Sequence, residues 1–269
     1  MPTPLLWSMP FHAALDPEYM PLIMKRPVVI AQSLNAFCVR NESFADTIQV
    51  DDGDDFVAVN SLQSEESEGS YPGLTSWMNN VDAKLSLSVF GAGSSSLQER
   101  KVMGKRSIPW PDFLKSLSSL QPEFFIWITH GVNGTSSGAM QYREDSDKED
   151  FVPIVPTDLI MSTCLRRNKL TVLVSCMAAQ WEIGERREGE ISGFIRAFRG
   201  TGAGVVFAPR WQVGVTEAGH WLTCLAKRLK VGKDVLRASD LAHSITKYLA
   251  SNTQDVQQRL AACVFCPFV

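Results

Sequence analysis

The stretch EFFIWIT, residues 123–129, is the strongest indicator of the fold, because it is a continuous apolar, aromatic and β-branched run of strand length. Such a run predicts a central strand that is covered on both of its faces. LTVLVS at 170–175 and AGVVFAP at 203–209 have the same character. Helical patterns with one apolar face lie between these runs, within 156–168 and 190–202. Strands that alternate with helices favour an α/β fold with a mostly parallel sheet and helices on both of its faces.

Further elements are expected on both sides of this core. We expect strands at 26–33, 55–60, 86–90 and 260–269, and helices at 74–85, 111–120, 216–229 and 233–249. Thr157 is expected to cap the helix that begins there, and residues 132–150 are expected to form a long polar loop. Nothing in the composition forces a division, so we expect one domain over 1–269, with half of the sheet in 1–122 and the other half in 123–269.

Composition argues against several classes of protein. The 269 residues carry a formal net charge of −3 without a basic stripe, so we expect no direct nucleic-acid partner. No apolar run reaches the roughly 18 residues of a membrane-spanning helix, and the N-terminus lacks the basic segment of a signal peptide. The six scattered cysteines favour reduced thiols in a cytoplasmic protein. Cys263 and Cys266 form a lone C-x-x-C motif, interpreted as buried thiols rather than a zinc or redox site, and no metal or cofactor is expected.

Two chemically useful residues stand where predicted strands end. His130 follows the first central strand and Cys176 follows the second, with room for one loop and one crossover helix between them. Because the carboxyl ends of parallel strands meet at one edge of a sheet, we expect these side chains to lie close together. An imidazole keeps a nearby thiol partly as the nucleophilic thiolate and can protonate a leaving amine. The backbone amides of Gly131 and Cys176 are candidates for an oxyanion hole. The alternative interpretation is a buried thiol and a core histidine.

These motifs, taken in order, resemble those of the CHAT family of caspase-like cysteine peptidases. The family pattern has a strand ending in T-H-G, seen here as WITHG at 127–131, and then a strand ending in S-C, seen here at 175–176. A glycine- and glutamate-containing stretch, a helix of G-L-x-R-A-F type, an apolar strand and a W-x-V tripeptide follow in both. The resemblance covers about residues 7 to 269 and implies a caspase-like three-layer αβα sandwich with a mostly parallel central sheet.

The resemblance also assigns roles to residues. It makes Cys176 the nucleophile and His130 the general acid/base, with the amides of Gly131 and Cys176 as the oxyanion hole. Trp211, in the W-x-V tripeptide, would border the substrate cleft. This chain departs from the family at Gly214, because an acidic residue usually follows the tripeptide. It also lacks the Q-A-C-x-G signature of caspases, so specificity for aspartate is not implied.

Charged residues near the predicted cleft leave its preference open. Glu182 and Glu185 follow the nucleophile, and they are interpreted either as a solvated loop or as an acidic rim that selects Arg or Lys at the cleaved bond. Arg210, beside Trp211, would have the opposite effect and select an acidic residue. The sequence does not decide between these interpretations.

The leading functional hypothesis is a cysteine endopeptidase that cleaves a specific protein partner. The resemblance implies a regulated bacterial defence or cell-death pathway, with gasdermin-like pore formers or CRISPR-linked proteins as substrates. We expect an activating protein in trans, or processing by another protease, and no membrane partner. Two alternatives remain: a catalytically silent CHAT-like domain that acts as a protein-binding module, and a domain that binds a small molecule at the sheet edge.

Overall fold

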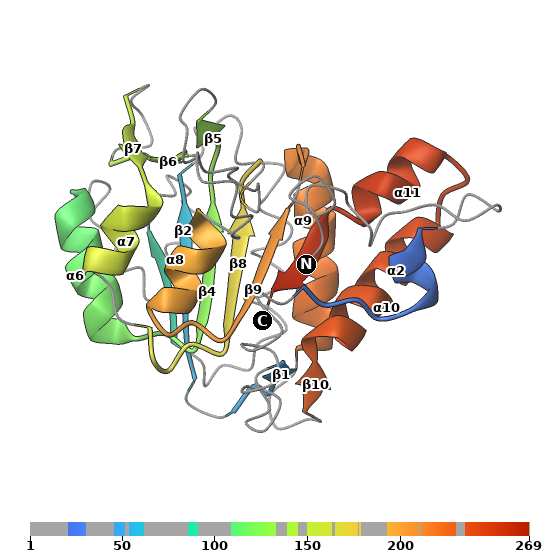
Figure 1. Ribbon diagram of the computed structural model, residues 1–269, viewed down its shortest axis with the longest axis horizontal. Helices are drawn as coiled ribbons and strands as arrows, with labels where there is room; N and C mark the ends of the chain where they lie inside the picture. The colour runs from blue at the N-terminus through green and yellow to red at the C-terminus, as the bar shows by residue number, and fades with distance from the viewer. Residues whose placement is uncertain are drawn as a thin grey trace, which may run out of the picture.

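A six-stranded sheet forms the centre of the molecule (Figure 1). The computed structural model describes residues 21–30, 46–51, 54–61, 86–90, 109–132, 139–144, 150–162, 165–176, 178, 193–209, 211–229 and 235–268. In spatial order the strands are β11 (Phe265–Phe268), β9 (Val205–Pro209), β8 (Leu170–Val174), β4 (Phe124–Ile128), β2 (Asp55–Asn60) and β3 (Ser86–Phe90). Neighbouring strands are parallel except β11, which runs antiparallel to β9. The predicted mostly parallel sheet is therefore confirmed.

The two strands at the centre, β4 and β8, are buried along their whole length. Their side chains alternate between two separate apolar clusters, one on each face of the sheet. Fully burying a large apolar side chain contributes about 1.5–3 kcal/mol. This two-sided burial explains why the strand sequences show no alternation of polar and apolar residues.

Helices cover both faces of the sheet and complete a three-layer αβα sandwich (Figure 1). The layer on one face contains α6 (Trp110–Leu120), α7 (Pro156–Ser162) and α8 (Phe194–Gly200). The layer on the other face contains α2 (Leu22–Lys25), α9 (Val215–Arg228) and α10 (Ala238–Ser251), and α11 (Val256–Ala262) packs against α10. Among the residues that the structure describes, no helix is long and apolar enough to cross a membrane.

The prediction of one long polar loop over 132–150 is wrong. Strand β5 (Gly131–Val132) pairs antiparallel with β6 (Ala139–Tyr142), which pairs antiparallel with β7 (Val152–Ile154). Met140 and Tyr142 of β6 are buried in the cluster that contains α6, and the Tyr142 ring packs on Trp110 and Phe113. Burial of Met140 and Tyr142 therefore stabilises a short strand between polar segments. This small sheet lies at the edge where β4 and β8 end (Figure 1).

The helix predicted over 156–168 is shorter than expected, because α7 reaches only Ser162 and residues 166–167 form a turn. Thr157 lies inside this helix and does not cap it. The carboxylate of Asp158 instead accepts a hydrogen bond from the N–H of Val155 at 3.0 Å. Pro156 at the helix start and an acid in the first turn explain this boundary.

Four other predictions concern the ends of the chain and the region before β3. Residues 26–30 contribute one isolated bridge, between Ile30 and Phe268, where a strand was predicted. The predicted strand 260–269 is a strand only from Phe265, because α11 precedes it. The predicted helix 233–249 begins only at Ala238, because β10 (Leu236–Arg237) precedes it and pairs antiparallel with β1 (Thr47–Ile48). The helix predicted at 74–85 lies outside the described residues.

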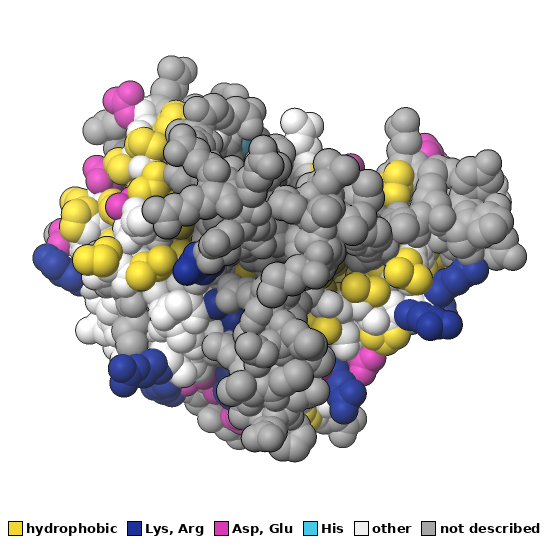
Figure 2. Space-filling model, viewed as in Figure 1, with side chains coloured by type: hydrophobic (Ala, Val, Ile, Leu, Met, Phe, Trp, Pro, Cys, Tyr) yellow, Lys and Arg dark blue, Asp and Glu magenta, His cyan; other side chains and the backbone are white. Residues whose placement is uncertain are grey.

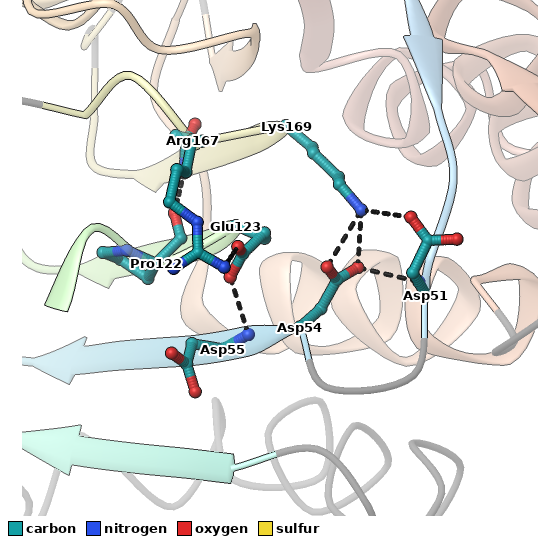
Figure 3. A network of polar contacts seen from close by, with 8 residues as sticks. Asp51, Asp54, Asp55, Pro122, Glu123, Arg167 and Lys169 are labelled. Carbon is teal, nitrogen blue, oxygen red and sulfur yellow. Dashed lines mark hydrogen bonds and ion pairs between the residues drawn. The ribbon is translucent and has the colours of Figure 1, made fainter.

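A polar network closes the edge of the sheet where β2, β4 and β8 begin (Figure 3). The Lys169 ammonium contacts the carboxylates of Asp51 and Asp54 at 2.7 and 2.8 Å. Buried Glu123 accepts a hydrogen bond from the N–H of Asp55 at 2.8 Å. These contacts hold the starts of neighbouring strands together at the edge away from His130 and Cys176.

Cys263 and Cys266 are both buried, as the sequence predicted for this C-x-x-C pair. Cys266 lies in β11, whereas Cys263 lies just after α11 and donates to the Arg259 carbonyl at 3.2 Å. Burial raises the pKa of the Cys263 thiol to about 12. This environment disfavours the thiolate that redox or zinc chemistry requires.

Candidate active site

The carboxyl ends of β4 and β8 bring two chemically useful positions to one edge of the sheet. Ile128 pairs with Val174, and the N–H of Thr129 donates to the Val174 carbonyl at 2.9 Å, one step beyond the named strands. His130 and Cys176 each lie two residues after the end of their strand. Because neighbouring strands lie about 4.8 Å apart, this register places residues 130 and 176 at adjacent strand ends.

The Cys176 thiol lies on the α9 side of the sheet. Ile128 and Val174, the last residues of β4 and β8, belong to the cluster that faces α9 and α10. The Cys176 Sγ lies 3.6 Å from the carbonyl oxygen of Val213, which packs against that same cluster. His130 and Cys176 are each half-buried, as an accessible reacting pair must be.

Gly131 lies directly against the backbone of Cys176. A Cβ atom at Gly131 would be 2.5 Å from the Cys176 carbonyl oxygen and 3.4 Å from the Ser175 Oγ. Only a residue without a side chain fits this approach without a backbone shift. The glycine after the histidine therefore brings the two strand ends together.

Strand β6 fixes the backbone around His130 from the other side. The N–H of Gln141 donates to the His130 carbonyl at 2.9 Å, and the Thr129 hydroxyl donates to the Gln141 carbonyl. Sequence analysis missed Gln141, because residues 132–150 were interpreted as a loop. The apolar residues Ala139, Met140 and Tyr142, which are buried in the structure, were the available sequence signal.

The chain turns sharply after β8. The N–H of Ala178 donates to the Ser175 carbonyl at 3.2 Å, so Cys176 lies at the corner of a turn. Ser175 is fully buried, and within the described part of the chain its hydroxyl has no hydrogen-bond partner. The half-buried thiol of Cys176 is thereby presented at the strand end while its neighbour points into the interior.

The cleft residues predicted from the sequence are placed only in part. Trp211 is half-buried and packs against the cluster shared with α9, two residues before Val213. Arg210, Glu182 and Glu185 lie outside the described residues. The structure therefore brings Trp211 to the edge that holds Cys176 and leaves the other three as predictions.

Sequence analysis also missed Glu217, which lies in the first turn of α9. Gly214 is the N-cap of that helix, and a Cβ atom there would lie only 2.0 Å from the Glu217 Oε2. The Glu217 carboxylate thus fills the space beside Gly214, the position where the sequence lacks the expected acid. A glutamate three residues after a helix cap is a common first-turn residue, so the sequence alone gave it no special meaning.

The residues that the structure describes contain no group of three or more His, Cys, Asp or Glu side chains placed to hold a metal ion. His243 lies away from the site, where its Nδ1 contacts the Ile23 carbonyl and joins α10 to α2. The groups that the ends of β4 and β8 bring to this edge are a thiol, an imidazole and backbone amides.

Comparison with known proteins adds one finding. A family model described as "CHAT domain" matches residues 1–244. No curated protein matches the chain. The match includes both strand ends, the helix α8 and the Trp211 segment.

Proposed function

This chain belongs to the CHAT domain family, and from that premise we propose that it is a cysteine endopeptidase that cleaves a specific protein partner. Cys176 is the nucleophile and His130 is the general acid/base. The observation that carries this proposal is the contact of Gly131 with the Cys176 backbone, at paired strand ends that also carry His130 and the thiol. The three-layer αβα sandwich supplies the scaffold, because ligands of such sheets bind beyond the carboxyl ends of the strands.

The reaction follows from these groups. The Cys176 sulfur attacks the carbonyl carbon of the scissile peptide bond while His130 takes the thiol proton. The amides of Gly131 and Cys176 donate to the oxyanion that forms, and His130 then gives its proton to the leaving amine. A thioester remains, and His130 accepts a proton from the water that hydrolyses it. The carboxylic acid product leaves and the free thiol is restored.

The resting contact of the thiol bears on the first step. The Cys176 Sγ donates to the Val213 carbonyl at 3.6 Å, so the thiol proton must exchange that acceptor for the imidazole before attack. Rotation about the Cα–Cβ bond of Cys176 releases the Val213 carbonyl without moving the strands.

We extend the proposal to the biological setting on family membership alone. The enzyme acts in the cytoplasm in a regulated bacterial defence or cell-death pathway, on a gasdermin-like or CRISPR-linked substrate. An activating protein in trans, or processing by another protease, controls it. The whole chain, 1–269, acts as one peptidase domain.

A second candidate, a catalytically silent protein-binding module, is favoured by one surface feature. Phe151, Ile160 and Met161 are 40%, 47% and 83% exposed around β7 and α7. Figure 2 shows hydrophobic side chains gathered over this side of the molecule. Exposed apolar clusters of this kind are typical of protein-binding surfaces. Such a surface also suits a protease that docks its partner, so it does not exclude the first candidate.

Detection of new N-termini, produced by proteolysis in cells, distinguishes the endopeptidase from the silent binding module. The wild type, Cys176→Ala and Cys224→Ala variants are each co-expressed with a candidate partner, and mass spectrometry identifies the N-termini produced. Cys224 is a buried thiol on α9, so its variant controls for loss of a cysteine away from the site. We expect cleavage with the wild type and Cys224→Ala, and a loss of about 10³-fold or more with Cys176→Ala. Equal cleavage by all three would reject Cys176 as the nucleophile.

A further inference from the structure

The N-terminus of α9 lies beside the nucleophile. The Val213 carbonyl oxygen is 3.6 Å from the Cys176 Sγ, Gly214 is the N-cap, and the helix begins at Val215. The first turn of this helix is therefore next to the position where a substrate carbonyl would be attacked.

One acidic side chain of that turn, Glu217, bends back toward Gly214. The Glu217 Oε2 lies 2.0 Å from where a Cβ atom on Gly214 would be, and Gly214 is covalently bonded to Val213, whose carbonyl contacts the thiol. Taken together, these contacts put the carboxylate within about 10 Å of the Cys176 Sγ. Glu217 is exposed, and its carboxylate makes no ion pair or hydrogen bond with another residue in the described part of the chain.

We propose that Glu217 determines specificity by selecting a lysine or arginine immediately before the scissile bond. This inference rests on the proposed peptidase function. When the sulfur reaches the carbonyl carbon of that residue, its side chain begins one bond away and extends about 6–7 Å. A cationic head group at that distance meets the carboxylate in a charge-assisted hydrogen bond. The proposal favours the first of the two preferences left open by the sequence, a basic residue over an acidic one.

The competing explanation is that Glu217 only stabilises its helix. An acid in the first turn interacts favourably with the helix dipole wherever the helix lies. Asp240 offers a matched comparison, because it is exposed and stands third in α10, as Glu217 stands third in α9. Replacing either acid by its amide removes the same dipole interaction, but only Glu217 belongs to the helix whose N-terminus lies next to Cys176.

The test uses reagents that need no knowledge of the natural substrate. Tosyl-lysine chloromethyl ketone and tosyl-phenylalanine chloromethyl ketone each present one side chain and one electrophilic carbon. The Cys176 sulfur displaces chloride from that carbon and forms a thioether, and the thiol proton is released. Peptide mass mapping measures the rate of modification at Cys176 in the wild type, Glu217→Gln, Glu217→Lys and Asp240→Asn proteins. Iodoacetamide, which presents no side chain, corrects each rate for the reactivity of the thiol itself.

We expect the wild type and Asp240→Asn to react about tenfold or more faster with the lysine reagent than with the phenylalanine reagent, after correction. Glu217→Gln should lose this preference, and Glu217→Lys should reverse it. Equal rates for both reagents in the wild type, or an unchanged preference in Glu217→Gln, would overturn the proposal. A faster reaction of the wild type with an aspartate chloromethyl ketone would also overturn it and would favour Arg210.

Fluorogenic peptides that differ only in the residue before the cut separate this inference from the peptidase proposal. Wild-type cleavage after alanine but not after lysine would reject the role of Glu217 and keep the enzyme. A lysine preference in alkylation without hydrolysis of any peptide would keep Glu217 as a binding determinant and reject the endopeptidase. A preference that depends on Glu217 in both assays supports both.

Discussion

The Cys176 carbonyl oxygen lies 2.5 Å from the place where a Cβ atom on Gly131 would be, so the two strand ends of the candidate site meet through backbone alone. We therefore expect Gly131→Ala to lower kcat/KM by about 100-fold, since oxyanion donors tolerate little displacement. Gly200→Ala is the matched control, because a Cβ atom at the end of α8 would meet nothing within 4 Å. Peptide hydrolysis and thermal unfolding of both variants check this, and full activity of Gly131→Ala would contradict it.

His130 is predicted to act in proton transfer and not in folding. His130→Ala should lower kcat by about 10²–10⁴-fold with little change in melting temperature, because general acid–base catalysis contributes that much. His220→Ala, at an exposed position on α9, should leave both quantities unchanged. A melting temperature that falls in parallel with activity would instead indicate a structural histidine.

The sequence predicted the centre of this fold well, because runs that are apolar along their whole length are typical of central strands covered on both faces. The uninterrupted apolar runs at 123–129, 170–175 and 203–209 became β4, β8 and β9, each buried throughout. Since parallel strand ends share an edge, the positions of His130 and Cys176 followed from the same runs. Where both faces of a strand are covered, a local pattern contains the tertiary information.

What the sequence missed depends on contacts between distant residues. Strand β6 is only four residues long between polar segments, and it becomes a strand because Met140 and Tyr142 find an apolar layer. In the sequence, Glu217 looks like an ordinary acid in the first turn of a helix. Its approach to Gly214 is visible only in the three-dimensional structure. The roles of Arg210, Glu182 and Glu185, and the extent of the domain, stay predictions.

The cysteines should differ in their rates of alkylation according to how deeply each thiol is buried. In the native protein at pH 8, iodoacetamide should modify half-buried Cys176 far faster than Cys224 or Cys263. Burial raises the pKa of Cys224, against the lowering effect of Arg228 and Lys227, and it raises the pKa of Cys263 to about 12. A pKa near 12 leaves about one thiol in 10⁴ as the reactive thiolate at this pH. Mass mapping after timed labelling measures the rates, and native labelling of Cys263 as fast as Cys176 would contradict the buried placement.

The Lys169 network should contribute stability that depends on pH. Burial lowers the pKa of Lys169, but hydrogen bonds and charge from Asp51 and Asp54 outweigh this and raise it. A pKa raised by folding means that the contribution is fully present below the unfolded value of about 10.4 and is lost as pH rises through the folded value. Lys169→Met should therefore lower the free energy of unfolding by about 1 kcal/mol at pH 7, and the difference from wild type should shrink above the folded pKa.

Two variants make this prediction specific. Lys169→Arg keeps its charge at high pH, so it should keep its stability where the wild type loses part of its own. Lys115→Met breaks the Lys115–Asp112 pair, whose side chains are 80% and 61% exposed, against 27% and 8% for Lys169 and Asp54. Water screens such an exposed pair, so its loss should change stability by less than about 0.5 kcal/mol. Urea unfolding at pH 7 and at pH 11.5 measures all three variants, and a Lys169→Met deficit that is equal at both pH values would contradict the assignment.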